Sequence, residues 1–259
     1  MKRRLQNTIS KFIPVAVILL LLCIWQIVSA NELIPKYMLP SPYEVVLALK
    51  NDFPLLMSHA KVTVMEAFIG LFFGVVLGVL IAVIMDMCDF LYKALYPLLI
   101  ITQTIPTIAI APLLVLWLGY EMLPKIVLII IMTFFPVAVG MFDGLKTADV
   151  DEMKLMKVMG ASQLKIFRYI KLPEAMSHFF AGLRVSVAYA VVGAVISEWL
   201  GGYIGLGVYM TRVKKSYDFD KMFAVIFLIT ALSLVLMALV GVLQKICMPW
   251  ERVKNKEKI

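Results

Sequence analysis

The chain has 259 residues, of which 62% are hydrophobic, and its formal net charge is +8. Its mean hydropathy is +0.94, whereas soluble domains contain about 45–50% apolar residues. This excess excludes an ordinary water-soluble domain. The positive charge raises the question of a nucleic-acid partner, but the basic residues are not interleaved with aromatic residues on a soluble face, which argues against that class.

The apolar residues are gathered into six long runs. About 20 residues are needed to cross roughly 30 Å of hydrocarbon, and lipid offers backbone groups no hydrogen-bond partner, so such runs must be helices. They also lack the polar–apolar alternation of an outer-membrane barrel strand. We therefore expect a single all-α, polytopic membrane domain over 1–259, with spans at about 12–30, 62–85, 94–118, 126–142, 179–198 and 222–244.

The positions of lysine and arginine orient these spans. Most of the 25 basic residues fall in segments that share a side with the amino terminus, and cytoplasmic loops are the ones enriched in Lys and Arg. We therefore expect both termini in the cytoplasm of a bacterial cell, with the chain in the cytoplasmic membrane. Cleavage of residues 12–30 as a signal peptide would put the basic carboxyl end outside, so we expect a retained span. One loop that we expect outside does not follow this charge rule, because it contains four basic residues: Arg212, Lys214, Lys215 and Lys221.

Proline positions predict two further features. Ser41 and Pro42 are the residues that begin a short helix over 39–49, which we expect to lie along the outer membrane surface. The third span contains Pro97, Pro106 and Pro112. Each proline removes a backbone donor, so this span is either a broken helix that lines a cavity or is packed in protein, or a merely kinked packing helix.

The longest polar loop, at about 143–177, has the pattern of two short helices. Asp149, followed by Glu152, matches a capping box, and Gly160 stands where a left-handed helix end belongs. Ser162 begins the second helix, which we expect to end before Pro173. Apolar residues exposed on a cytoplasmic loop indicate a docking surface. The alternative is that this segment folds back onto the membrane.

At this loop the sequence resembles a known family. Gly160-Ala161-Ser162 is followed by Ile170-Lys171-Leu172-Pro173 at the spacing found in ATP-binding-cassette (ABC) importer permeases. The Glu-Ala-Ala part of that signature is replaced by Lys154, Leu155 and Met156. The resemblance implies that the first helix docks on a separate ATPase and that Ile170, Leu172 and Pro173 shape the loop. The implied docking residues are Asp151, Glu152, Met153, Leu155, Met156, Met159, Gly160 and Ala161.

Other stretches narrow the resemblance. Leu39-Pro-Ser-Pro42, Ile105–Pro112 and Phe180-Ala-Gly-Leu-Arg184 are similar to the nitrate, sulfonate and taurine branch, and residues 192–210 are similar to permeases for thiamine pyrimidine precursors. The resemblance implies a type I importer permease, with ATP and Mg bound by the partner ATPase and an external binding protein delivering substrate. No internal repeat is evident, which favours two copies forming one pathway.

Ionisable residues near the spans are the remaining candidates for function. Glu198 and Trp199 stand at the outer end of span five and either contact a heterocycle on the translocation path, together with Pro106 and Pro112, or form an interfacial belt. Glu66 is expected within reach of water, and His59 at the interface. The turn at 202–207 is expected to be a mobile outer loop, since it lacks the strand and lysine of a phosphate-binding loop.

The resulting hypothesis is the permease subunit of an ATP-driven importer for a small polar molecule, best a hydroxymethylpyrimidine-type precursor of thiamine. Sulfonate, taurine, nitrate or riboflavin are alternative substrates. We expect no catalytic residues, no metal site and no cofactor in this chain, because no catalytic set, metal-ligand spacing or ATP-binding motif occurs. The rival class, an ion-coupled secondary transporter, needs an intramembrane relay for which the spans offer few acids.

Overall fold

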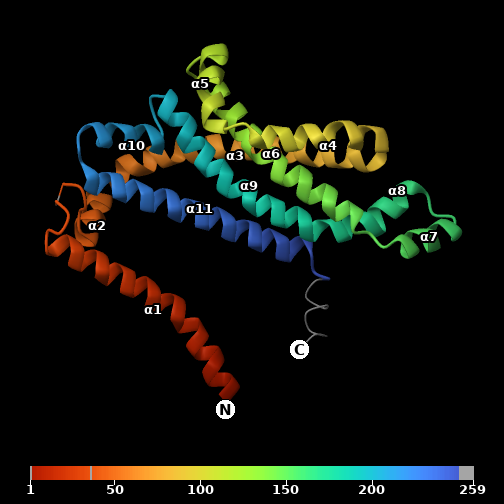
Figure 1. The fold of residues 1–259 in the computed structure, drawn as a ribbon, viewed down its shortest axis with the longest axis horizontal. Helices are drawn as coiled ribbons and strands as arrows, with labels where there is room; N and C mark the ends of the chain where they lie inside the picture. The colour runs from red at the N-terminus through yellow and green to blue at the C-terminus, as the bar shows by residue number, and fades with distance from the viewer. Residues whose placement is uncertain (1, 36, 251–259) are drawn as a thin grey trace. The chain divides into compact units, whose positions relative to one another are not determined.

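The computed structural model describes residues 2–35 and 37–250, and these residues form only helices and their connections (Figure 1). This confirms the all-α prediction. Among the described residues, five helices are long and apolar enough to cross a membrane, and one bent pair makes a sixth span if it is counted once. In chain order the helices are α1 Lys2–Ala30, α2 Pro42–Asn51, α3 Phe53–Met87, α4 Asp89–Thr104, α5 Thr107–Leu118, α6 Met122–Lys146, α7 Val150–Val158, α8 Gln163–Ile166, a π-helical segment η1 Phe167–Lys171, α9 Leu172–Leu200, α10 Leu206–Lys215 and α11 Phe219–Cys247.

The third predicted span is broken rather than kinked. The axes of α4 and α5 differ by 95° (Figure 1). The break falls at Ile105, which has an extended backbone with ψ of 121°, because the ring of Pro106 disfavours the helical conformation in the residue before it. Pro97 and Pro112 lie inside α4 and α5 without ending them. The backbone of this span is therefore a broken helix, which was the first of the two alternatives.

The predicted end of the second loop helix is wrong. No helix ends before Pro173; instead α8, η1 and α9 follow one another without an interruption. A proline inside an α-helix removes one backbone hydrogen bond and crowds the carbonyl four residues earlier. Here a wider π turn accommodates Pro173, because the Leu172 N–H donates to the carbonyl of Phe167, five residues back. Pro173 then occupies the first turn of α9, where a proline is tolerated.

One compact unit consists of residues 1–58 and 209–228. Ser41 and Glu44 form a capping box that begins α2, as the sequence predicts for Ser41. The indole N–H of Trp25 donates to the Pro40 carbonyl at 3.0 Å, which ties α1 to the segment before α2. The Tyr209 hydroxyl donates to Asp52 at 2.6 Å. This hydrogen bond, with Lys221 nearby, lowers the pKa of Asp52, so the carboxylate stays ionised at neutral pH.

The described part of the second unit consists of residues 59–208 and 229–250. Its centre is the pair α6 and α9, which approach closely because glycines remove side chains from the contact. A Cβ atom on Gly182 of α9 would lie 2.3 Å from the Pro136 carbonyl oxygen of α6. Across the same contact the Ser186 hydroxyl donates to the Thr133 carbonyl at 2.7 Å. These contacts fix the register of the two helices.

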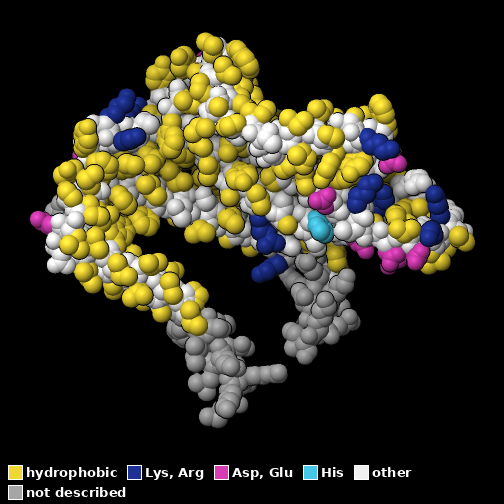
Figure 2. Space-filling model, in the orientation of Figure 1, with side chains coloured by type: hydrophobic (Ala, Val, Ile, Leu, Met, Phe, Trp, Pro, Cys, Tyr) yellow, Lys and Arg dark blue, Asp and Glu magenta, His cyan; other side chains and the backbone are white. Residues whose placement is uncertain are grey.

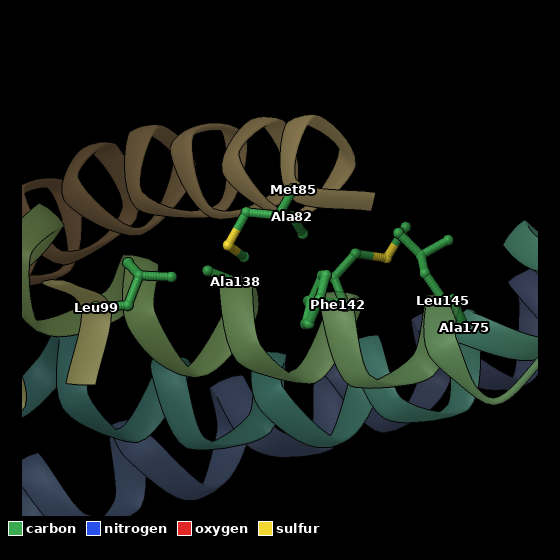
Figure 3. Close-up of a cluster of buried hydrophobic side chains, with 8 residues drawn as sticks. Ala82, Met85, Leu99, Ala138, Phe142, Leu145 and Ala175 are labelled. Atoms are coloured by element: carbon green, nitrogen blue, oxygen red, sulfur yellow. The ribbon is translucent and has the colours of Figure 1, made fainter. Parts of the chain in front are cut away.

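Around this pair, α3 and α4 complete the apolar core. The glycines at 70, 74 and 78 of α3 face α6 at four-residue intervals, so the two helices pack with little side-chain volume between them. Figure 3 shows where side chains from α3, α4, α6 and α9 meet. That cluster consists of Ala82, Met85, Leu99, Ala138, Met141, Phe142, Leu145 and Ala175.

Replacing Gly182 by Ala tests the close contact of α6 with α9. Alanine is the better helix former by about 1 kcal/mol, yet its Cβ would meet a backbone carbonyl, which cannot rotate away. We expect a lower melting temperature in detergent. Gly241→Ala in α11 is the matched control, because its Cβ would meet nothing within 4 Å, and it should raise the melting temperature. Equal effects at the two positions would contradict this packing.

Candidate functional site

Helix α7 and its two caps form the most exposed apolar element of the loop between α6 and α9. The Asp149 carboxylate accepts hydrogen bonds from the N–H groups of Asp151 and Glu152 and so begins the helix. At the other end Gly160 has φ of +79°. Its N–H donates to the Lys157 carbonyl, and the Ala161 N–H donates to the Met156 carbonyl. This is the Schellman arrangement, and it confirms the two predicted ends of the helix.

None of the residues of α7 is buried. Val158 is 87% exposed, Met159 77% and Leu155 62%, while Met153 and Met156 are half-buried. Figure 2 shows that charged side chains gather over α7 and α8, whereas hydrophobic ones cover α4 and α5. Helix α7 is thus short, its two ends are fixed by hydrogen bonds, and several of its apolar side chains are exposed. The described residues leave this surface open to a partner.

The base of the loop is fixed by an ion pair that the sequence does not predict. The Lys171 ammonium lies 2.8 and 2.9 Å from the two carboxylate oxygens of Asp86, at the end of α3. The Asp86 side chain is 4% exposed. Ile170, one of the expected loop-shaping residues, is buried beside it, and Leu172 and Pro173 are half-buried. A groove of about 640 Å³ lies along this base, lined mainly by residues of α3, α8 and η1.

Glu198 is placed differently from both readings of the sequence. Its side chain is neither exposed to water nor free to meet a passing molecule, because it is 2% exposed. Its two oxygens accept hydrogen bonds from the Thr63 hydroxyl at 2.7 Å and from the Gly207 N–H at 2.6 Å. Trp199 is 44% exposed, and Pro106 and Pro112 are exposed on the broken span. Of these four residues, Glu198 therefore has a structural role, because its carboxylate is used in hydrogen bonds within the protein.

The expectation that water reaches Glu66 is also wrong, and a second residue of this outer region, His59, is buried as well. Glu66 is 1% exposed and pairs with Lys125 at 2.7 Å, so water does not reach it. His59 is buried, with Nδ1 at 2.9 Å from the Gly205 nitrogen, which donates to it. Lys125 lies 59 residues from Glu66, and no local pattern marks such a pair.

The turn expected to be mobile is held by side chains. Consecutive N–H groups of Gly205, Leu206 and Gly207 donate to His59, Thr63 and Glu198. The last two of these groups belong to the first turn of α10, where backbone donors lack partners within the helix. A Cβ on Gly205 would lie 2.2 Å from the Glu198 carboxyl carbon, so the glycine allows this close contact. No group of three or more His, Cys, Asp or Glu in the described residues is arranged to hold a metal ion.

The described residues form five or six candidate spans, with an exposed, capped helix between two of them, and this arrangement defines a polytopic membrane protein. The family described as "Binding-protein-dependent transport system inner membrane component" matches residues 74–249, and the chain belongs to that family. It is thus a multi-pass inner membrane protein and the permease component of an ABC importer, which works with separate ATPase subunits. The permease component is not itself catalytic and carries no cofactor.

Similar proteins cover nearly the whole chain. The formylaminopyrimidine transport permease ThiX of Halalkalibacterium halodurans is 36% identical over 92% of this chain and 96% of its own length. A probable ABC transporter permease of Haemophilus influenzae is 37% identical over 86% of this chain and 91% of its own. Taurine and nitrate permeases are more distant, at 25% and 23% identity. The resemblance to this branch is therefore confirmed.

The fold is also similar to a solved transporter. The inward-facing methionine ABC transporter MetNI contains a chain that matches with a TM-score of 0.64, over 76% of this chain and 96% of that one, at 20% identity. At this identity the similarity concerns the fold alone. It supports the all-helical importer architecture that the sequence predicts.

Replacing Asp86 by Asn tests the ion pair at the base of the loop. The change leaves the Lys171 ammonium without its charged partner in a largely buried place, and we expect a loss of about 1–3 kcal/mol of stability. Asp151→Asn is the matched control, because its pair with Lys154 is exposed, at 89% and 70%, and such pairs contribute about 0–1 kcal/mol. The measurement is the melting temperature of both variants in detergent. A smaller effect at Asp86 than at Asp151 would contradict the assignment.

Proposed function

We propose that this chain imports a small polar heterocycle, of the pyrimidine type from which thiamine is made, across the inner membrane. The support is the 36% identity to a formylaminopyrimidine permease over nearly the full length of both chains. Residues 192–210, which resemble such permeases in sequence, form the end of α9, the glycine turn and the start of α10. Sulfonate, taurine, nitrate and riboflavin remain the alternative substrates.

The ATPase subunits dock on α7 in this proposal. The single observation that carries it is the exposure of Leu155, Val158 and Met159 on a helix capped at both ends, because exposed apolar patches on a soluble loop mark interaction sites. The docking residues are those expected from the sequence: Asp151, Glu152, Met153, Leu155, Met156, Met159, Gly160 and Ala161. Docking places this loop, and with it both chain termini, in the cytoplasm.

In this proposal a movement of α7 is transmitted to the membrane-spanning helices through an ion pair and a continuous helical segment. The loop beyond α7 is tied to α3 by the ion pair of Lys171 with Asp86, and α8, η1 and α9 form one uninterrupted helical segment. Closure of the ATPase subunits on ATP therefore shifts α9 together with α7, and α6 follows because it is in backbone contact with α9. Two copies of the chain form the pathway, and an external binding protein delivers the substrate. An ion-coupled secondary transporter would leave α7 without a role.

Introducing carboxylates at apolar positions of α7 tests whether the ATPase docks there. We expect the triple change Met153→Asp, Met156→Asp and Met159→Asp to abolish co-purification of the ABC ATPase subunit in mild detergent, since three carboxylates cannot enter an apolar interface without a large desolvation cost. The triple change to Leu keeps the apolar surface and should retain the ATPase. Retention by the Asp variant, with the protein still folded, would remove α7 from the interface.

Uptake measurements test the substrate. Cells that express the complete transporter should accumulate labelled formylaminopyrimidine in an ATP-dependent way, and unlabelled pyrimidine should compete with it. Taurine and riboflavin in the same excess should not compete, because they lack the pyrimidine ring or greatly exceed its size. Cells with the Met-to-Asp variant supply the control for background uptake. Accumulation of taurine or riboflavin in place of the pyrimidine would refute the substrate while leaving the docking proposal intact.

A further inference from the structure

A buried polar cluster lies where the outer ends of α3, α6 and α9 meet. Two acids belong to it, Glu66 from α3 and Glu198 from α9, with exposures of 1% and 2%. Lys125 from α6 is 6% exposed and is the basic partner. His59 and Thr63 of α3 complete the group. The first turn of α10 adds backbone N–H groups and no charged side chain.

The hydrogen bonds of Glu198 fit an ionised carboxylate. Its Oε1 accepts from the Thr63 hydroxyl and its Oε2 from the Gly207 N–H. The Thr63 hydroxyl oxygen accepts from the Leu206 N–H at 2.9 Å, and its single proton has two acceptors, Glu198 at 2.7 Å and the His59 carbonyl at 3.3 Å. A proton on Glu198 would therefore either turn the Thr63 hydroxyl to its longer hydrogen bond with His59 or displace the Gly207 N–H. Glu198 is also an anion at the N-terminus of α10, a position that favours negative charge.

Glu66 has one oxygen that is not accounted for. Its Oε1 accepts from the Lys125 ammonium at 2.7 Å. Its Oε2 is buried and has no hydrogen-bond partner among the described residues. The carboxyl group of Glu198 lies close to that of Glu66. Two ionised carboxylates cannot bond to each other, because both only accept, whereas a protonated Glu66 can donate to Glu198.

The charges lead to the same assignment. His59 Nδ1 lies 2.9 Å from both the nitrogen and the carbonyl oxygen of Gly205, so the ring can accept the Gly205 N–H as a neutral imidazole. With His59 neutral, one ammonium faces two carboxyl groups, and full ionisation would leave one uncompensated negative charge in a buried place. A single proton makes the cluster neutral. We propose that the cluster is a proton-binding site, with the proton on Glu66 Oε2 and donated to Glu198.

This proton has a structural consequence for the turn. It lets Glu198 keep both oxygens on Thr63 and Gly207, and so hold the glycine turn and the start of α10 against α3 and α9. The proposal concerns the residues of this cluster and does not depend on the transported substrate or on docking at α7.

Infrared spectroscopy of the complete transporter in lipid detects the proton directly. We expect a carboxylic-acid C=O band at neutral pH that shifts when the glutamates carry ¹³C and disappears in Glu66→Gln. The matched control Glu174→Gln removes an exposed acid and should leave the band unchanged. Absence of the band from the unmodified protein, or its persistence in Glu66→Gln, would overturn the proposal.

The two glutamine variants should also differ in stability. A glutamine at position 66 reproduces the neutral acid, since its oxygen accepts from Lys125 and its NH₂ group donates to Glu198, so the melting temperature should stay close to that of the unmodified protein. A glutamine at position 198 turns an NH₂ group toward the donors Thr63 and Gly207, so the melting temperature should fall. The opposite order of the two variants would move the proton to Glu198 and refute the assignment. If the position 198 variant does not fold, the infrared comparison at position 66 still decides.

Discussion

The backbone contact between α6 and α9 is the constraint on which the rest of this unit depends. At Gly182 the Pro136 carbonyl occupies the space that any side chain would need, and the Ser186 hydroxyl fixes the sliding position of the two helices. With α6 and α9 held as a pair, Lys125 and Glu198 come to the same end, where α3 supplies Glu66 and Thr63. At the opposite end the same pair carries the loop that contains α7.

Features that depend on neighbours in sequence were predictable. Asp149, Gly160 and Ser41 cap their helices as expected, because a cap needs only its own side chain or φ angle and the backbone a few residues away. The six apolar regions were predictable for a similar reason, since length and composition decide whether a helix can cross lipid.

Features that depend on distant partners were not predictable. Glu66 looked accessible because Lys125 is 59 residues away, and Glu198 looked like a pathway residue because Thr63 is 135 residues away. The turn at Gly205 looked mobile for the same reason, since its partner His59 is separated from it by 146 residues. Pro173 was misjudged on different grounds. A rule for α-helices predicted a helix end, whereas the chain widens to a π turn and continues.

The π turn at Phe167–Lys171 also sets a rotational phase. Each residue of an α-helix turns the chain by about 100°, whereas a π turn takes up one extra residue over nearly the same rotation. Loss of one residue within this turn would therefore let an ordinary α turn form, with the exposed face of α7 aimed much as before. A residue lost from the α-helical part of α9 has no such turn to absorb it, and it would rotate that face by about 100°.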